Sequence, residues 1–158
     1  MNYYAAYKLL TKNGEPTSLH TTVLFRHDTD DETLQMIINE LKNLELENKL
    51  VHVTSEKYLD GPNGEPNMIK TCLLDFVDDN SGGLEKLENL CKNFTYRRYL
   101  VVQHPFTFHT SVGNKDPNGK KYKEYLENQK TLNDHNEFIL GDLYLKNMDT
   151  KEVIKITI

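Results

Sequence analysis

Alternating apolar and polar positions predict that this chain is rich in antiparallel strands. Near its end, for example, Ile154, Ile156 and Ile158 alternate with Lys155 and Thr157. Successive side chains of a strand point to opposite faces, so a period of two is typical of a strand with one buried face. Apolar runs and alternations between turn residues predict strands over residues 3–10, around His20, and over residues 50–59, 68–77, 98–103, 107–112, 137–146 and 151–158.

Three other segments have patterns typical of helices. The first follows the acidic residues 28–32, which favour a helix start because they lie at the positive end of the helix dipole. Its apolar residues then recur at intervals of three and four, namely Leu34, Ile37, Ile38, Leu41 and Leu44. Similar spacing predicts a second helix over residues 84–94, and a charged third helix is expected over residues 119–130.

The expected elements come in a similar order twice along the chain. Two strands, a helix and a hairpin are followed by a helix, two strands, another helix and a second hairpin. We interpret this order as a loose internal duplication, and no low-complexity tract separates the two halves. A chain of 158 residues can bury a substantial core in one domain. The sequence therefore predicts a single α+β domain over residues 1–158, with two lobes that share a continuous sheet system and a cleft between them.

Two of the expected strands carry nearly identical segments, which read S-L-H-T-T-V and T-F-H-T-S-V. Side chains two positions apart on a strand share a face, so His20 points with Thr22, and His109 points with Ser111. The opposite faces are apolar and suit a core, with Leu19, Val23 and Phe25 in one segment and Phe106, Phe108 and Val112 in the other.

Two such histidines can act as a general base and a general acid on a phosphodiester. One neutral imidazole removes a proton from the attacking hydroxyl or water, and the other, protonated, supplies one to the leaving oxygen. Thr22 and Ser111 would donate hydrogen bonds to the nonbridging oxygens. Which histidine is acid and which is base stays open at this point. This chemistry needs no metal and no cofactor.

The pair of segments resembles the His-x-[Ser/Thr]-hydrophobic motifs of the 2H phosphoesterase superfamily, also called LigT-like. The resemblance implies a bilobed α+β fold, with two antiparallel sheets lining a central cleft and helices outside. It also implies a metal-independent phosphodiesterase whose catalytic residues here are His20, Thr22, His109 and Ser111.

Several substrates are known within this superfamily. Its members act on 2′,3′-cyclic ends, on 2′–5′ oligoadenylates, or on cyclic oligonucleotide signals. In size and composition the chain looks like the phage members that destroy the cyclic messengers of antiphage defence, the anti-CBASS proteins, so cyclic oligonucleotides are the preferred substrate. The alternatives are a 2′,3′-cyclic phosphate or 2′–5′ RNA-end phosphodiesterase, a module that sequesters a nucleotide without cleaving it, and a structural protein.

Two further histidines also satisfy the short pattern His-x-Thr. His27 lies in the acidic segment expected to lead into the first helix, and is therefore set aside. His52 lies on an expected strand, but its polar face continues into Glu56, and Ser55 stands where the motif requires an apolar residue. His20 and His109 are therefore preferred.

Aromatic and basic residues near the motifs are candidates for substrate contacts. The first expected strand carries Tyr3, Tyr4 and Tyr7, and aromatic rings can stack on a nucleobase. Tyr3 and Tyr7 are taken as candidates for this role. Lys115, close after the second motif, is the candidate for a phosphate contact, whereas other cations such as Arg97 receive no role.

Composition limits the classes of partner. A net charge of −5 argues against binding to duplex DNA, which usually needs a basic face, but not against a local basic pocket for a nucleotide. The sequence has no apolar run long enough to span a bilayer and does not begin like a signal peptide. Cys72 and Cys91 are too few and too far apart for a zinc motif. We therefore expect a cytoplasmic protein, in the host cytoplasm if it is phage-encoded, whose oligomeric state the sequence leaves open.

Overall fold

Strands dominate this computed structural model, which describes residues 1–156. Within that range the elements are β1 (Tyr3–Thr11), β2 (Pro16–Arg26), α1 (Asp31–Lys42), β3 (Leu50–Leu59), β4 (Ile69–Phe76), α2 (Gly83–Phe94), β5 (His109–Asn114), α3 (Tyr122–Asp134), β6 (Glu137–Asn147) and β7 (Val153–Ile156). Of the last expected strand, residues 157 and 158 lie outside the described range. None of the helices between residues 1 and 156 is long and apolar enough to cross a membrane.

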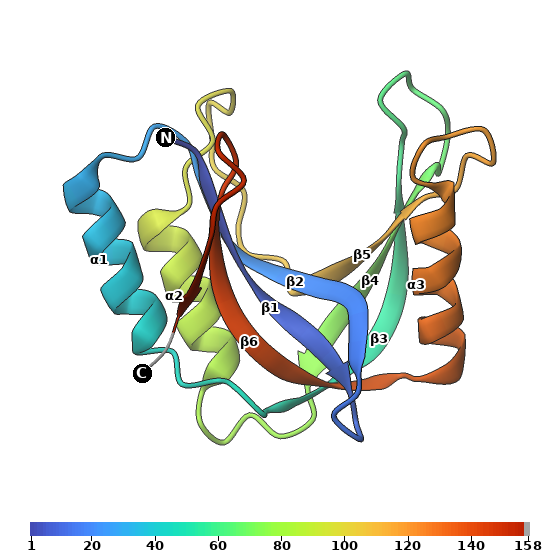
Figure 1. The fold of residues 1–158 in the computed structure, drawn as a ribbon, viewed down its shortest axis with the longest axis horizontal. Coiled ribbons are helices and arrows are strands. Elements are labelled where there is room, and N and C mark those ends of the chain that lie inside the picture. Colours follow the sequence, from blue (N-terminus) through green and yellow to red (C-terminus); the bar gives the residue numbers. More distant parts are fainter. Residues whose placement is uncertain (157–158) are drawn as a thin grey trace.

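The seven strands form one antiparallel sheet in the order β2-β1-β6-β3-β4-β5, with β7 paired to β6. Figure 1 shows two lobes, with β1, β2 and β6 beside α1 and α2, and with β3, β4 and β5 beside α3. The lobes are joined where β3 pairs with β6, for example at Val51 and Phe138. The α+β class is therefore confirmed, and the two expected sheets are the two halves of one continuous sheet.

The lobes do not coincide with the two halves of the sequence. The β3–β4 hairpin, from the first half, pairs with β5, the motif strand of the second half. The β6–β7 hairpin, from the second half, pairs with β1 beside the first motif strand. Each half thus contributes its hairpin to the opposite lobe, an exchange that the order of elements alone does not reveal.

One expected strand, over residues 98–103, is wrong. The segment is a turn and bend in which the Gln103 side chain donates to the carbonyls of Arg97 and Leu100, each at 3.2 Å. Val101 and Val102 are exposed there. Apart from one bridge between Arg26 and the preceding Tyr96, no strand in the described range pairs with this part of the chain.

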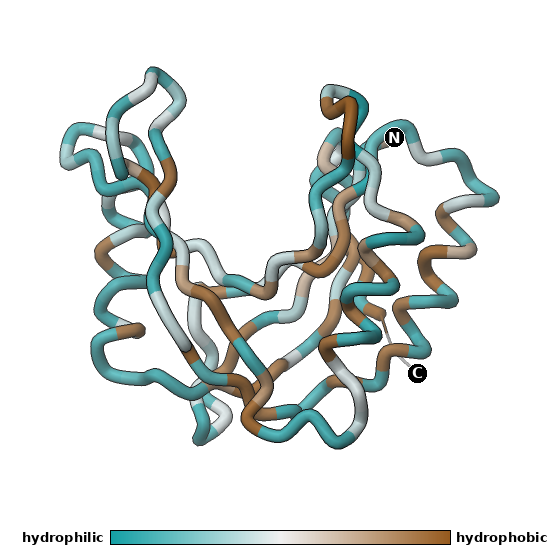
Figure 2. The backbone as a smooth tube through the Cα atoms, turned by 180° about the vertical axis from the view of Figure 1, so that it is seen from behind, coloured by the Kyte–Doolittle hydropathy of each residue, from teal (hydrophilic) through white to brown (hydrophobic). Residues whose placement is uncertain are grey.

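The hydrophobic core is continuous between the sheet and the helices. Figure 2 shows hydrophobic segments following the strands through the middle of the molecule, whereas many loops are hydrophilic. Ile37 and Leu41 of α1 and Leu87 and Leu90 of α2 belong to the same buried cluster as the core side chains of β1 and β6. Burial of this apolar area is the main favourable term in folding.

The two motif strands, β2 and β5, stand at opposite ends of the strand order and yet lie side by side. Two side-chain hydrogen bonds join them. The Thr21 hydroxyl donates to the carbonyl of His109 at 2.6 Å, and the Thr110 hydroxyl donates to the carbonyl of His20 at 2.7 Å. The sheet therefore curves until its two edges meet at the histidine motifs.

Candidate active site

A cavity of about 860 Å³ contains both motif histidines in its lining. His20 and Thr22 reach it from β2, and His109 reaches it from the start of β5. The rest of the lining comes from residues 23–25 of β2, from β1, from the outer end of β3, from the end of α2 and from residues 95–107. The two histidines that the sequence pairs on one phosphodiester thus line the same cavity.

Strand alternation explains why the histidines point into the cavity. On β2, Leu19, Thr21 and Val23 are buried, whereas His20 and Thr22 between them are half-buried. On β5, Thr110 and Val112 are completely buried, so the side chains that alternate with them, His109 and Ser111, point the other way. The apolar side of each motif holds its strand on the core, which leaves the imidazole side free for a ligand.

The two imidazoles are held differently. His109 Nδ1 lies 2.7 Å from the carbonyl oxygen of Thr107. A carbonyl oxygen only accepts, so this nitrogen must carry the proton, and Nε2 is the atom left for chemistry.

His20 lies in an environment that favours the neutral form. Burial lowers the pKa of His20 below its ordinary value, and repulsion by His109 and Lys146 lowers it further, whereas the Glu124 carboxylate acts in the opposite direction. The Tyr4 ring, with its centroid 6.2 Å from that of His20, lies beside it in the cavity.

Cations and aromatic rings line the remaining walls. The Arg97 guanidinium stacks over the Phe25 ring at 4.8 Å, and both residues line the cavity. Lys57 contributes a second cationic side chain from β3. No carboxylate is among the described residues that line this cavity, although the protein as a whole carries a net charge of −5.

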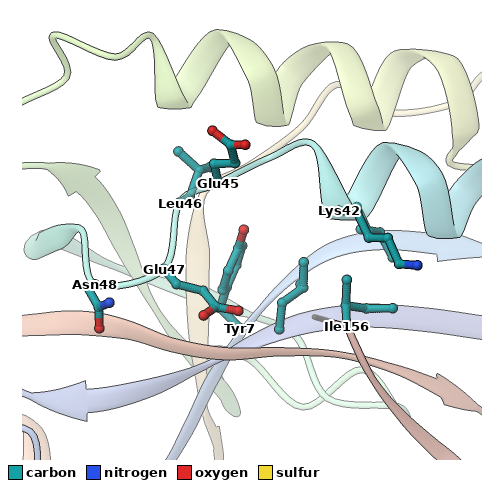
Figure 3. Close-up of a pocket in the computed structure, with 9 residues that line it drawn as sticks. Tyr7, Lys42, Glu45, Leu46, Glu47, Asn48 and Ile156 are labelled. Carbon is teal, nitrogen blue, oxygen red and sulfur yellow. The ribbon is translucent and has the colours of Figure 1, made fainter. Parts of the chain in front are cut away.

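Two of the tyrosines expected to contact substrate are instead core residues, which corrects that expectation. Tyr7 is only 1% exposed and faces the α1 side of the sheet, beside a separate hollow of about 270 Å³ (Figure 3). Tyr3 is also buried, and its hydroxyl accepts from the Asn147 side chain at 3.4 Å. Tyr4, on the opposite face of β1, is the tyrosine that lines the cavity.

The fold places the other residues that were singled out from the sequence outside the cavity lining. Ser111 is exposed, and it is not among the residues that line the cavity. Lys115 lies 4.8 Å above the Tyr58 ring, outside the cavity lining. His52 and His27 are also outside it: His52 is paired with Asp75 on β4, and His27 accepts the Arg98 N–H at 3.2 Å.

Several lining residues were not predicted from the sequence. Arg97 was given no role, Phe25 was expected in the core, and Lys57 and Phe106 were not proposed as ligand contacts. The sequence did contain a signal for Tyr4. It lies four positions before Lys8 on the same face of β1, and the charged, exposed Lys8 marks that face as the one away from the core. The register of β1 against β2 shifts at a bulge between Ala5 and Ala6. Simple alternation along β2 therefore does not predict which face of the strand carries Phe25.

No group of three or more His, Cys, Asp or Glu side chains within residues 1–156 is placed to hold a metal ion.

No protein-family model matches the chain, and no curated protein sequence matches it. Among solved structures, Kluyveromyces marxianus Usb1 with uridine monophosphate superposes with a TM-score of 0.50 at 12% identity, over 98% of this chain and 81% of that one. The α+β fold of this chain is therefore the 2H phosphoesterase fold.

Proposed function

We propose that this protein is a metal-independent phosphodiesterase that cleaves a nucleotide phosphodiester with His20 and His109. The observation that carries this proposal is the presence of both imidazoles in one cavity, although they come from strands far apart in the sequence. Two histidines of this kind supply the general base and the general acid that the reaction needs.

The surroundings of the two histidines support an assignment of their roles. His20, whose pKa is lowered by burial, is the base that takes the proton from the attacking hydroxyl or water. The attacking oxygen then bonds to phosphorus as the bond to the leaving oxygen breaks. His109, whose Nδ1 donates to the Thr107 carbonyl, gives the proton on Nε2 to the leaving oxygen. Thr22 donates to a nonbridging oxygen as negative charge builds there.

The charge and shape of the cavity support an anionic, aromatic ligand. Lys57 and Arg97 attract phosphate, and Tyr4 and Phe25 present rings on which a base can stack. Positive charge concentrated here in an acidic chain is typical of a small phosphate-bearing ligand and not of a nucleic-acid duplex. The structural neighbour Usb1 was solved with uridine monophosphate, which also supports a nucleotide.

Among nucleotides, we propose cyclic oligonucleotide messengers of antiphage defence as the preferred substrate, acting in the host cytoplasm. A volume of about 860 Å³ is at the upper end of the ordinary range for ligand sites, as a ligand of more than one nucleotide requires. Lys57 and Arg97 come from different elements of the lining, which suits a ligand with more than one phosphate. A 2′,3′-cyclic phosphate or a 2′–5′ RNA end is the alternative substrate.

A substrate panel in EDTA tests the proposal. Purified protein is incubated with cyclic di- and trinucleotides, 2′,3′-cyclic mononucleotides and 2′–5′ oligoadenylates, and the products are separated by chromatography. We expect turnover of at least one cyclic oligonucleotide in EDTA, faster than of the mononucleotides. Tight binding of a panel member without turnover would instead identify a sequestering module. Loss of turnover in EDTA that a divalent ion restores would overturn the two-histidine mechanism.

A further inference from the structure

The middle residue of each histidine motif makes a matched contact with the other motif. Thr21, after His20, donates to the carbonyl of His109, and Thr110, after His109, donates to the carbonyl of His20, at 2.6 and 2.7 Å. Both threonines have no exposed surface. The two bonds are reciprocal between the motifs, so we call them together the threonine clasp.

The hydrogen bonds from these two hydroxyls take the place of the backbone-to-backbone hydrogen bonds that ordinarily join adjacent strands. In the strand order, β2 and β5 are the two ends, and no ladder pairing joins them within the described residues. The nearby Asn128 of α3 accepts from Ser18 and donates to the carbonyl of Val112 at 2.9 Å. Ser18 precedes His20 whereas Val112 follows His109, so the strands pass in opposite directions beneath the imidazoles.

We propose that Thr21 and Thr110 are positioning residues that set the separation of the His20 and His109 imidazoles. Each bond holds the backbone carbonyl of the residue whose side chain lines the cavity, so a shift of either carbonyl shifts an imidazole with it. The catalytic meaning of the clasp rests on the phosphodiesterase proposed above, whereas its effect on geometry does not.

Burial explains why these two positions need a hydroxyl. Both side chains point to the apolar side of their strands, where a β-branched valine would have the same shape. A buried hydroxyl is unfavourable unless it is hydrogen-bonded, and a buried carbonyl has the same requirement. Paired threonines satisfy both groups at once, and valine at either position would leave one histidine carbonyl without its partner across the gap.

Removal of the hydroxyl at constant shape tests the clasp. We compare Thr21→Val, Thr110→Val and the serine variants at both positions, with Thr29→Val as the matched control. Thr29 is also buried and donates to a backbone carbonyl, that of Arg26 at 3.2 Å, but it does not line the cavity. Far-UV circular dichroism and amide NMR spectra establish that each variant is folded.

Two measurements distinguish a positioning role from a structural one. We expect each valine variant to lower kcat by about 10- to 100-fold with KM within about twofold, as a misplacement of the order of an ångström does, and the serine variants to retain most of the activity. By NMR titration, the pKa of His20 should rise in the valine variants, since the repulsion by His109 weakens and the opposing Glu124 and nearby Lys146 stay in place. Folded valine variants that match Thr29→Val in both measurements would overturn the proposal.

Two further outcomes stay informative. If the wild type turns over no substrate, the phosphodiesterase proposal fails, and the NMR titration still decides whether the clasp sets the imidazole pair. If the valine variants do not fold, the wild type is used, where we expect slowly exchanging Thr21 and Thr110 hydroxyl protons with nuclear Overhauser contacts to the residues of the opposite motif. Rapid exchange of both hydroxyl protons would contradict the clasp.

Discussion

The two histidines of matching motifs differ in what surrounds them. His109 has one ring nitrogen committed to the Thr107 carbonyl, which leaves a single nitrogen for the substrate. His20 is half-buried, and its pKa is lowered by that burial and further by repulsion from His109 and Lys146. Two closely similar motifs thus place their histidines in different surroundings, because the fold and not the motif decides what lies around each ring.

The lowered pKa of His20 predicts how kcat depends on pH. If His20 is the base, kcat should fall only below the ordinary range of histidine, where the imidazole becomes protonated. Lys146→Gln removes a positive charge that disfavours protonation, so the pKa of His20 rises and the acidic limb moves to higher pH. Glu124→Gln removes the opposing charge and should move that limb to lower pH. Rate–pH profiles measure both, and shifts of the opposite sign would assign the base role elsewhere.

The two hydroxyl residues of the motifs should contribute unequally. Thr22 lines the cavity, whereas Ser111 is exposed and does not line it. We expect Thr22→Ala to lower kcat by about 10-fold or more, since it removes a donor aimed at developing charge, and Ser111→Ala to cost several times less. Steady-state kinetics of both variants under the same conditions provide the comparison. A larger loss for Ser111→Ala would mean that β5 moves when substrate binds.

The motif pattern selects the two histidines that line the cavity but misses part of their surroundings, for a physical reason. His20 and His109 were identifiable because each motif joins a polar face and an apolar face on one strand. Tyr3 and Tyr7 were misassigned because aromatic rings suit both a core and a ligand site, and only Lys8 marks the outer face of β1. Arg97 acquires its position from a turn that the Gln103 side chain closes, and the next residue, Arg98, donates its N–H to the distant His27.

At the scale of elements, strands were predictable where they have partners. The expected strand over residues 50–59 agrees with β3 residue for residue. Residues 98–103 have similar β-branched content but no neighbouring strand to pair with, and Gln103 closes a turn there instead. The meeting of β2 and β5 could not be predicted either, because the pairing of edges depends on the curvature of the whole sheet.

The side chain of Asn128 connects three elements and should contribute to stability. It is 3% exposed and bridges β2 and β5 from α3. Asn128→Ala leaves the Val112 carbonyl buried without this donor, and should lower the free energy of unfolding by about 1–3 kcal/mol. Asn133→Ala, on the exposed face of the same helix, is the control and should change it by less than about 0.5 kcal/mol. Chemical denaturation measures both, and equal values would show that the bridge contributes nothing.

At the scale of the whole molecule, the exchange of hairpins ties the two lobes together. Because β3–β4 and β6–β7 each pair in the lobe opposite to their own half of the sequence, neither half contains a complete lobe. The order of elements predicted the lobes but not this exchange, since both arrangements produce the same order along the chain.

We propose on this basis that the chain is one domain, and predict a single cooperative unfolding transition. Far-UV circular dichroism, which follows all the strands and helices, and tyrosine fluorescence should give the same midpoint in denaturant. Resolved transitions would mean that the lobes unfold independently.

The central claim is that the fold brings two distant histidines to one phosphodiester. It is tested most directly by the turnover, in EDTA, of the cyclic oligonucleotide that the wild type cleaves fastest. His20→Ala and His109→Ala should each lower kcat by about 10²–10⁴-fold, the range for loss of a positioned acid or base. His52→Ala is the matched control, because His52 also precedes a threonine by two positions on a strand but lies outside the cavity lining, and it should retain nearly full activity. Abolished turnover in His52→Ala with near wild-type turnover in His109→Ala would contradict the pairing of the two motifs.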